Sequence, residues 1–267
     1  MKRLTKQEII KTTFLTLLQK ETDQLTKAVS CPDGDWIVKG FIDVAKNIYT
    51  ISVDTKVVSK ILELLIFPNL CTFATKNKLR IVLSKEQNFY PDLTFVDEAG
   101  NKYAVDIKTT YRKDEKTVSG MTLGAFTGYF RDRKSLKNTT FPYGDYVGHF
   151  VLGIIYTRTD KTIDERKIFQ MKDLQNIPSV VTNFKFFAQE KYKIAIDRPG
   201  SGNTKNIGGV TNIDDLINGN GPFAKLGENV FNDYWMNYLT NDMAKSAELK
   251  KPYYTNIKQY KTFKKIK

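Results

Sequence analysis

The sequence predicts an α/β fold of the α+β kind, in which a mixed β-sheet is flanked by helices. Two observations support this class: apolar residues recur at helical spacing in the first part of the chain, and alternating or continuous apolar runs fill its middle. A third observation concerns domain number, because no Pro-, Gly- or Ser-rich linker divides the 267 residues. We therefore expect a single domain over residues 1–267, with a hairpin at about 30–53 and a core at about 54–267.

Two helices are expected in the first part of the chain. Thr5 and Glu8 have the spacing of a capping box, and the apolar residues that follow favour a helix to about Val29. The alternating and β-branched residues after it are typical of a hairpin. Asp54 is suited to cap a second helix, and we expect Pro68 to end it because proline lacks a backbone donor.

The remaining chain combines strands with further helices. Strands are expected at residues 78–84, 93–96 and 102–111, at 146–158 as a buried central strand, and as two short strands between 178 and 196. Apolar residues at helical intervals predict a helix over residues 122–134, although Gly124 and Gly128 weaken this prediction. A Gly-rich loop at 198–209 precedes a mostly helical tail.

The composition favours an anionic partner and excludes several kinds of site. Forty-two Lys and Arg against 29 Asp and Glu give a formal net charge of +13, which favours a polyanion such as nucleic acid. Cys31 and Cys71 lack the paired spacing of a zinc site and indicate no disulfide framework, so a reducing cytoplasm is expected. His149, the only histidine, lies in an apolar run, which indicates a core or interface residue and excludes histidine-based triads. We expect no signal peptide and no membrane span.

A candidate catalytic site lies in the segment AVDIKTTY. Side chains alternate along a strand, so Asp106 and Lys108 share one face, whereas Val105 and Ile107 take the other. We expect the face of Val105 and Ile107 to pack in the core and the face of Asp106 and Lys108 to hold the catalytic groups. If the turn before this strand has five residues, Asp92 lies directly opposite Asp106.

Two facing carboxylates suggest a cation between them, because like charges placed opposite each other destabilise a hairpin. Mg²⁺ is typically held by one or two carboxylates together with substrate phosphate. Beside such an ion, Lys108 could polarise or deprotonate a water molecule and neutralise phosphoryl oxygens. The pattern therefore favours phosphodiester hydrolysis. The alternative is a surface hairpin with exposed ion pairs.

Pro91-Asp92 followed by Asp106-x-Lys108 matches the signature of the PD-(D/E)xK nucleases. The surrounding sequence resembles that of the type II restriction endonucleases. The resemblance runs from about Ser52 to the end of the chain. It is carried by the blocks DTKVVSKILELL, QNFYPDLT, VDIKTTY, TLGAFTGYFR, GSGNTKNIG, DYWMNY and YTNIKQY. It implies a restriction-endonuclease-like core.

By position in this signature, Asp92 and Asp106 would bind Mg²⁺ and Lys108 would be the catalytic lysine. Glu63 falls where the family has a further acidic residue near the metal, and it ranks below the other three. Because Glu63 shares a polar helical stripe with Lys56, a solvated helix face explains it equally well.

The resemblance also implies DNA contacts. The Gly-rich loop resembles a recognition loop that enters the major groove, and the stretch before Pro91 resembles a loop near the minor groove. The implied contacts are Gly200, Ser201, Gly202, Asn203 and Thr204 in the first loop, Gln87 and Asn88 in the second, and Lys56, Thr109, Thr110 and Lys137 elsewhere. Glu86 departs from the family pattern, and a plain surface turn, surface lysines and strand-pairing threonines are the alternatives.

Such enzymes work as homodimers, since two-fold symmetry lets one loop read both halves of a palindrome. The early hairpin is the candidate interface. The resemblance implies blunt cleavage of double-stranded DNA at GATATC, a bacterial cytoplasmic location and a cognate DNA methyltransferase that protects the host. Two alternatives remain open: an inactive DNA-binding protein of the same fold, and a nuclease of this fold with another recognition site.

Overall fold

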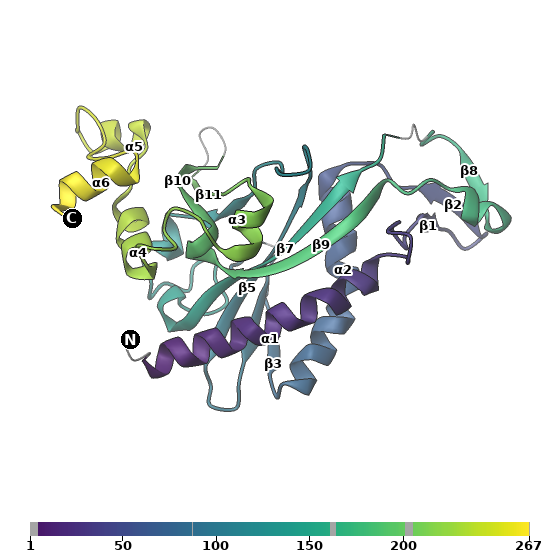
Figure 1. Ribbon diagram of the computed structural model, residues 1–267, viewed down its shortest axis with the longest axis horizontal. Coiled ribbons are helices and arrows are strands. Elements are labelled where there is room, and N and C mark those ends of the chain that lie inside the picture. Colours follow the sequence, from purple (N-terminus) through teal and green to yellow (C-terminus); the bar gives the residue numbers. More distant parts are fainter. Residues whose placement is uncertain (1–4, 87, 161–163, 201–204, 267) are drawn as a thin grey trace.

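A five-stranded mixed sheet forms the centre of the computed structural model, which describes residues 5–86, 88–160, 164–200 and 205–266 (Figure 1). Its strand order is β3-β4-β5-β7-β9. The strands are β3 (Arg80–Leu83), β4 (Leu93–Val96), β5 (Lys102–Tyr111), β7 (Tyr146–Arg158) and β9 (Val181–Glu190). β5 and β7 run parallel, whereas the other neighbours are antiparallel. The mixed α+β architecture predicted from the sequence is confirmed.

The apolar run of β7 lies between β5 and β9, as expected for a central strand. Its residues Phe150 to Tyr156 are all buried, because both faces of the sheet are covered. The predicted turn register is also confirmed, since Val96 pairs with Lys102 across β4 and β5.

Helices α1 (Lys6–Val29) and α2 (Thr55–Lys76) cover one face of the sheet. The capping box of Thr5 and Glu8 is present, and the Asp54 side chain accepts hydrogen bonds from the first turn of α2. Phe14 stacks on Tyr103 of β5 with ring centroids 4.2 Å apart, which fixes α1 against this strand. Each large apolar side chain buried in this layer contributes about 1.5–3 kcal/mol.

The prediction that Pro68 ends the second helix is wrong, because α2 continues through it to Lys76. Pro68 lies on the exposed side of the helix, where water can bind the carbonyl of Leu64 that proline leaves without a donor. On the opposite side Ile66 and Leu70 are buried before and after the proline. The burial of Ile66 and Leu70 outweighs the free-energy cost of the backbone hydrogen bond that Pro68 cannot donate.

Although α2 has the length and the mean hydropathy, 1.6, of a membrane-spanning helix, part of it is packed inside the protein. Its buried residues belong to the same apolar core as those of α1 and of the sheet. These α2 residues are Val58, Leu62, Ile66, Leu70, Phe73 and Ala74.

A second, three-stranded sheet packs on the other face of the sheet, and the C-terminal helices follow it, with α5 and α6 at the far end of the molecule (Figure 1). The second sheet has the order β10-β11-β6 and consists of β10 (Ala195–Pro199), β11 (Asn206–Gly209) and β6 (Thr122–Ala125). The helices are α3 (Ile213–Asn218), α4 (Glu228–Asn237), α5 (Asn241–Ser246) and α6 (Ile257–Lys264). Between these elements and the sheet lies a second apolar core, which we call the second core. It contains Trp235 and Phe126, whose ring centroids are 5.0 Å apart.

The helix predicted over residues 122–134 is therefore wrong. Residues 122–125 form β6, and only a short 3-10 turn follows at Gly128–Phe130. Gly124 and Gly128 have φ angles of +87° and +55°, which an α-helix does not accommodate. The helical spacing of the apolar residues reflects their packing in the second core.

A small sheet with the order β1-β2-β8 projects at the end of the molecule away from α6 (Figure 1). The predicted hairpin supplies β1 (Gly40–Ile42) and β2 (Asn47–Thr50), whereas β8 (Ile168–Gln170) was not expected. Between residues 178 and 196 the structure has the long strand β9 and then the start of β10 rather than two short strands. Further 3-10 turns lie at Tyr143–Asp145, Met171–Asn176 and Lys191–Ile194.

Candidate active site

The β4–β5 hairpin brings Asp92, Asp106 and Lys108 together. Asp92 precedes β4, and its Oδ2 accepts a hydrogen bond of 2.7 Å from the backbone amide of Ile107. The Asp92 amide in turn lies 3.4 Å from Oδ1 of Asp106, to which it donates. Leu93 pairs with Val105 in this antiparallel ladder, so the next two opposed positions are Asp92 and Asp106. The predicted opposition of the two carboxylates is thus present in the backbone register.

Lys108 lies between the two carboxylates. Its Nζ is 3.3 Å from Oδ2 of Asp106 and 3.6 Å from Oδ2 of Asp92. Burial by itself lowers the pKa of Lys108, but Asp106 and Asp92 outweigh it and raise the pKa above its usual value. Lys108 is therefore a firmly protonated ammonium in this arrangement.

The site is more buried than an exposed ion pair. The side chain of Asp106 is only 7% exposed, that of Lys108 24% and that of Asp92 37%. Burial raises the pKa of Asp92 to about 6; Lys108 counteracts this rise and Asp106 reinforces it. The burial of Asp106 and of all four residues of β4 does not fit the alternative of a solvated surface hairpin.

The division of β5 into a core face and a chemistry face needs correction. Val105 and Ile107 lie in the core beneath the helices, but Ala104, on the face of Asp106, is fully buried in the second core. β5 is thus covered on both faces at Ala104. It opens only toward Lys108, where a polar cleft of about 390 Å³ begins. This cleft is lined by Ser59, Glu63, Asp92, Ile107, Lys108, Thr109, Gly120, Met121 and Thr122.

Glu63 lines this cleft from α2 but pairs with Lys60 at 3.0 Å. Within the described ranges no group of three or more His, Cys, Asp or Glu residues could hold a metal ion. The structure therefore does not place Glu63 as a third direct ligand. Two carboxylates at the inner end of a polar cleft, which Asp92 lines, still suit Mg²⁺, because this ion keeps several waters and takes further oxygens from substrate phosphate.

The other predicted DNA contacts lie in several places. Thr109 lines the cleft, and Lys137 lines a separate cleft with Gly128 and Asn138. Lys56 and Asn88 are exposed, the former in the first turn of α2. Thr110 is buried and its hydroxyl donates to the carbonyl of Ser119 at 2.6 Å, which fits the strand-pairing alternative. Gln87, Ser201, Gly202, Asn203 and Thr204 lie outside the described residues.

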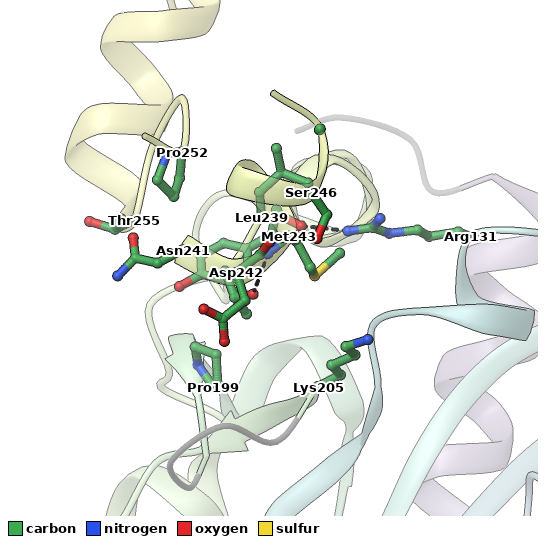
Figure 2. A pocket seen from close by; sticks show the side chains of 13 residues that line it. Arg131, Pro199, Lys205, Leu239, Asn241, Asp242, Met243, Ser246, Pro252 and Thr255 are labelled. Carbon is green, nitrogen blue, oxygen red and sulfur yellow. Dashed lines mark hydrogen bonds between the residues drawn. The ribbon is translucent and has the colours of Figure 1, made fainter. Parts of the chain in front are cut away.

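The Gly-rich loop connects two paired strands, β10 and β11. A Cβ atom at Gly200 would lie 2.9 Å from Cγ2 of Thr122 and 3.1 Å from Cα of Gly208, so only glycine fits there. A cleft of about 710 Å³ is lined by Pro199 and Lys205, which flank this loop, and by residues of the C-terminal segment. Figure 2 shows these side chains. Arg131 reaches into the cleft and donates to the carbonyl of Tyr238.

Sequence reasoning missed Lys191, a buried lysine that interacts electrostatically with Asp106. Lys191, which follows β9, is fully buried, and burial lowers its pKa to about 8 although Asp106 favours the charged form. His149 is buried as predicted, shares a hydrogen bond of 2.7 Å with the Tyr90 hydroxyl and stacks on Tyr143. Burial lowers the pKa of His149 well below its usual value, so it is neutral. A lysine at the end of an apolar strand was the available signal for Lys191.

The mixed sheet, its helical cover and the Asp-Asp-Lys set on one hairpin define the class of PD-(D/E)xK nucleases. Residues 32–265 match the family model described as Restriction endonuclease EcoRV. Over 229 residues, or 85% of the chain, the sequence is 36% identical to the type II restriction enzyme EcoRV of Escherichia coli, of which it covers 90%. This chain therefore belongs to the EcoRV family of type II restriction endonucleases.

Proposed function

We propose that this chain is a Mg²⁺-dependent endonuclease that hydrolyses phosphodiester bonds of double-stranded DNA at GATATC and leaves blunt ends. The observation that carries the proposal is the convergence of Asp92, Asp106 and Lys108, with Asp92 and Lys108 lining a polar cleft and the buried Asp106 3.3 Å from Lys108. The resemblance of the Gly-rich loop and the flexible central TA step, which favours bending, support the choice of site.

In this proposal the carboxylates of Asp92 and Asp106 would bind Mg²⁺. Glu63 of α2 would be a further acidic residue near the ion. When bound, the ion supplies charge for the phosphoryl oxygens and a more acidic water. The ammonium of Lys108 faces the cleft between the carboxylates, so it stabilises negative charge on the transferred phosphoryl group. Beside the ion, Lys108 would polarise or deprotonate the attacking water.

DNA recognition is assigned to the loop between β10 and β11. The amide of Asn203 suits the N6 and N7 edge of adenine in the major groove, and Thr204 suits a base or phosphate. Asn88 and Gln87 would approach the minor groove, and Lys56, Thr109 and Lys137 the backbone. The Glu86 carboxylate, which repels phosphate, distinguishes this chain from the family pattern.

We further propose that one endonuclease domain, residues 1–267, acts as a homodimer in the bacterial cytoplasm beside a cognate methyltransferase. The β1-β2-β8 sheet is the proposed interface, because its strands and turns expose large apolar side chains. These are Phe41, Ile42, Val44, Tyr49, Ile168 and Met171. A two-fold interface would let both copies read one palindrome.

The test is cleavage of a plasmid with a single GATATC site by wild-type and Asp106→Ala protein, with Mg²⁺ or with EDTA. We expect one linear product with blunt ends that requires both Mg²⁺ and Asp106. Cleavage at another sequence would retain the active site and refute the assigned recognition. Specific DNA binding without cleavage would identify an inactive DNA-binding protein.

A further inference from the structure

The Gly-rich loop is carried by two short strands whose pairing is irregular. β10 forms its first arm and β11 its second arm. The register of their pairing shifts between Ala195 and Pro199, and proline brings no backbone N–H to the ladder. Next to this irregularity the amide of Gly200 donates to the carbonyl of Asn206 at 3.0 Å. A regular ladder therefore does not fix the first arm along its length.

Asp197, inside this irregular stretch, joins the first arm to two C-terminal helices. Its carbonyl accepts a hydrogen bond of 2.6 Å from the hydroxyl of Tyr234 in α4. Its carboxylate Oδ2 accepts one of 3.0 Å from the amide of Ile257, the first residue of α6. The first amides of a helix lack partners within the helix and favour a negative charge nearby. Asp197 therefore links β10 to both helices, through its backbone and through its side chain.

Tyr234 is a rigid anchor for this link. It is fully buried in the second core, where its ring centroid lies 5.0 Å from that of Tyr254 and 5.2 Å from those of Tyr260 and Phe223. Its own carbonyl accepts a hydrogen bond of 2.7 Å from the Tyr254 hydroxyl. Because closely packed interiors transmit a displacement rather than absorb it, α4 holds the Tyr234 hydroxyl in one place.

The second arm is tied to the same helix by a different route. The carbonyl of Lys205, just before β11, accepts a hydrogen bond of 3.0 Å from the amide of Phe126. The Phe126 carbonyl in turn accepts one of 3.2 Å from Nε of Arg131. The same guanidinium also donates to the carbonyl of Tyr238, at the end of α4. Both arms of the loop are thus anchored on α4.

We propose that Asp197 and Tyr234 are positioning residues of DNA recognition, which fix the first arm of the Gly-rich loop on α4 and α6. The inference deepens the proposed function and rests on it, because that function assigns base recognition to the loop. Hydrogen bonds to base edges are directional, so a displacement of about 1 Å can cost about 100-fold in rate. The C-terminal helices thereby set the accuracy with which the loop meets DNA.

This link lies apart from the catalytic groups. The polar cleft at Asp92 and Lys108 is lined by α2, by the β4–β5 hairpin and by residues 120–122. Loss of the link should therefore change sequence discrimination and leave the proposed Mg²⁺ site at Asp92 and Asp106 unchanged.

Two pairs of variants test the proposal. Tyr234→Phe removes the hydroxyl that bonds to Asp197. Its matched control is Tyr254→Phe, because Tyr254 is also buried and donates to a backbone carbonyl, but to that of Tyr234 rather than to β10. Asp197→Ala removes the acceptor of the Ile257 amide, whereas Asp197→Asn keeps an acceptor oxygen.

Three quantities are measured for wild type and variants. The first is discrimination, taken as kcat/KM for a duplex with GATATC over that for duplexes with one base pair replaced. The others are hydrogen exchange of residues 195–209 by mass spectrometry and the increase in melting temperature with Mg²⁺. We expect Tyr234→Phe and Asp197→Ala to lower discrimination by about 10- to 100-fold and to speed exchange in this segment. Tyr254→Phe and Asp197→Asn should keep the wild-type discrimination and exchange, and all four should keep the Mg²⁺ effect.

A melting temperature that falls equally in Tyr234→Phe and Tyr254→Phe, with a loss of discrimination in the first alone, separates positioning from a structural role. The proposal is overturned if Tyr234→Phe discriminates as well as wild type, if Tyr254→Phe loses as much, or if Asp197→Asn is no better than Asp197→Ala.

The outcome for wild type distinguishes this inference from the proposed function. If wild type cuts another sequence, the assigned recognition site is wrong, and the same ratios at the new site decide the role of Asp197 and Tyr234. If wild type cleaves no DNA, the proposed function fails by itself. Unchanged exchange of residues 195–209 in Tyr234→Phe would then overturn the link as well.

Discussion

The ammonium of Lys108 lies 3.3 Å from Oδ2 of Asp106, two residues earlier on the same strand. Residues two apart on a strand share a face, so the strand itself sets this pair. The second carboxylate belongs to Asp92, the residue just before the neighbouring strand β4. Its Oδ2 lies 3.6 Å from Nζ of Lys108. One cation thus partly neutralises two acids, and replacing any of the three changes both stability and chemistry.

Replacing Lys108 by Met should slow cleavage by about 10²- to 10³-fold, the usual effect of losing one group that stabilises transition-state charge. It should also lower the free energy of unfolding by roughly 2–3 kcal/mol, because the buried Asp106 loses the ammonium that lies 3.3 Å from it. This is less than for a fully buried pair, since Lys108 is 24% exposed. Urea denaturation and single-turnover cleavage check both values. The double variant Lys108→Met/Asp106→Asn should regain stability but not activity, and a double variant as unstable as the single one would contradict the pairing.

Asp92→Asn should abolish cleavage yet stabilise the fold at neutral and alkaline pH. The pKa of Asp92 in the folded protein is about 6, above its ordinary value of 3.8, so folding favours the protonated form. The ionised carboxylate therefore destabilises the fold progressively as the pH rises from about 4 to 6, and by a constant amount above that. Melting temperatures between pH 3.5 and 8 should show the variant's advantage above pH 6 and its disappearance near pH 4. An advantage that grew toward low pH would refute the assignment.

Mg²⁺ should stabilise the folded protein through the two carboxylates. At a concentration one hundred times its Kd, a ligand that binds only the folded state adds about 2.7 kcal/mol to the free energy of unfolding. Thermal unfolding with Mg²⁺ and with EDTA measures this difference. Asp106→Asn should lose the Mg²⁺-dependent increase, and an equal increase in this variant would show that the ion binds elsewhere.

Phe41→Asp should convert the proposed dimer into monomers, because a buried carboxylate at an apolar interface lacks a partner. Phe41 lies on β1 and is 54% exposed in the single chain. Ile9→Asp is the matched control, since Ile9 is similarly exposed but lies on α1. Light scattering after gel filtration reports the mass. A dimer that persists in Phe41→Asp, or dissociates equally in Ile9→Asp, would rule out the β1-β2-β8 sheet as the interface.

Local sequence signals predicted the parts of the fold that depend on nearby residues. The capping box of Thr5 and Glu8 set the start of α1, and the five-residue turn set the register that places Asp92 opposite Asp106. These features involve hydrogen bonds and side-chain alternation over a few residues, so they can be deduced before the structure is known.

The failed predictions share one cause, which is packing against distant segments. The apolar residues between 122 and 134 have helical spacing, but they fill a core formed with the C-terminal helices, and Gly124 permits a strand with a positive φ. Pro68 was expected to stop α2, but burial on either side of it keeps the helix intact.

The sequence by itself determined the chemistry of the candidate site, because the motif, the alternation and the turn length place two carboxylates and a lysine together. Only the tertiary structure decided their surroundings: the burial of Asp106 and the enclosed ammonium of Lys191. The physical reason is that alternation along a strand is a local property. Burial and charge compensation depend instead on segments, here β6 and the end of β9, that lie far from β5 in the sequence.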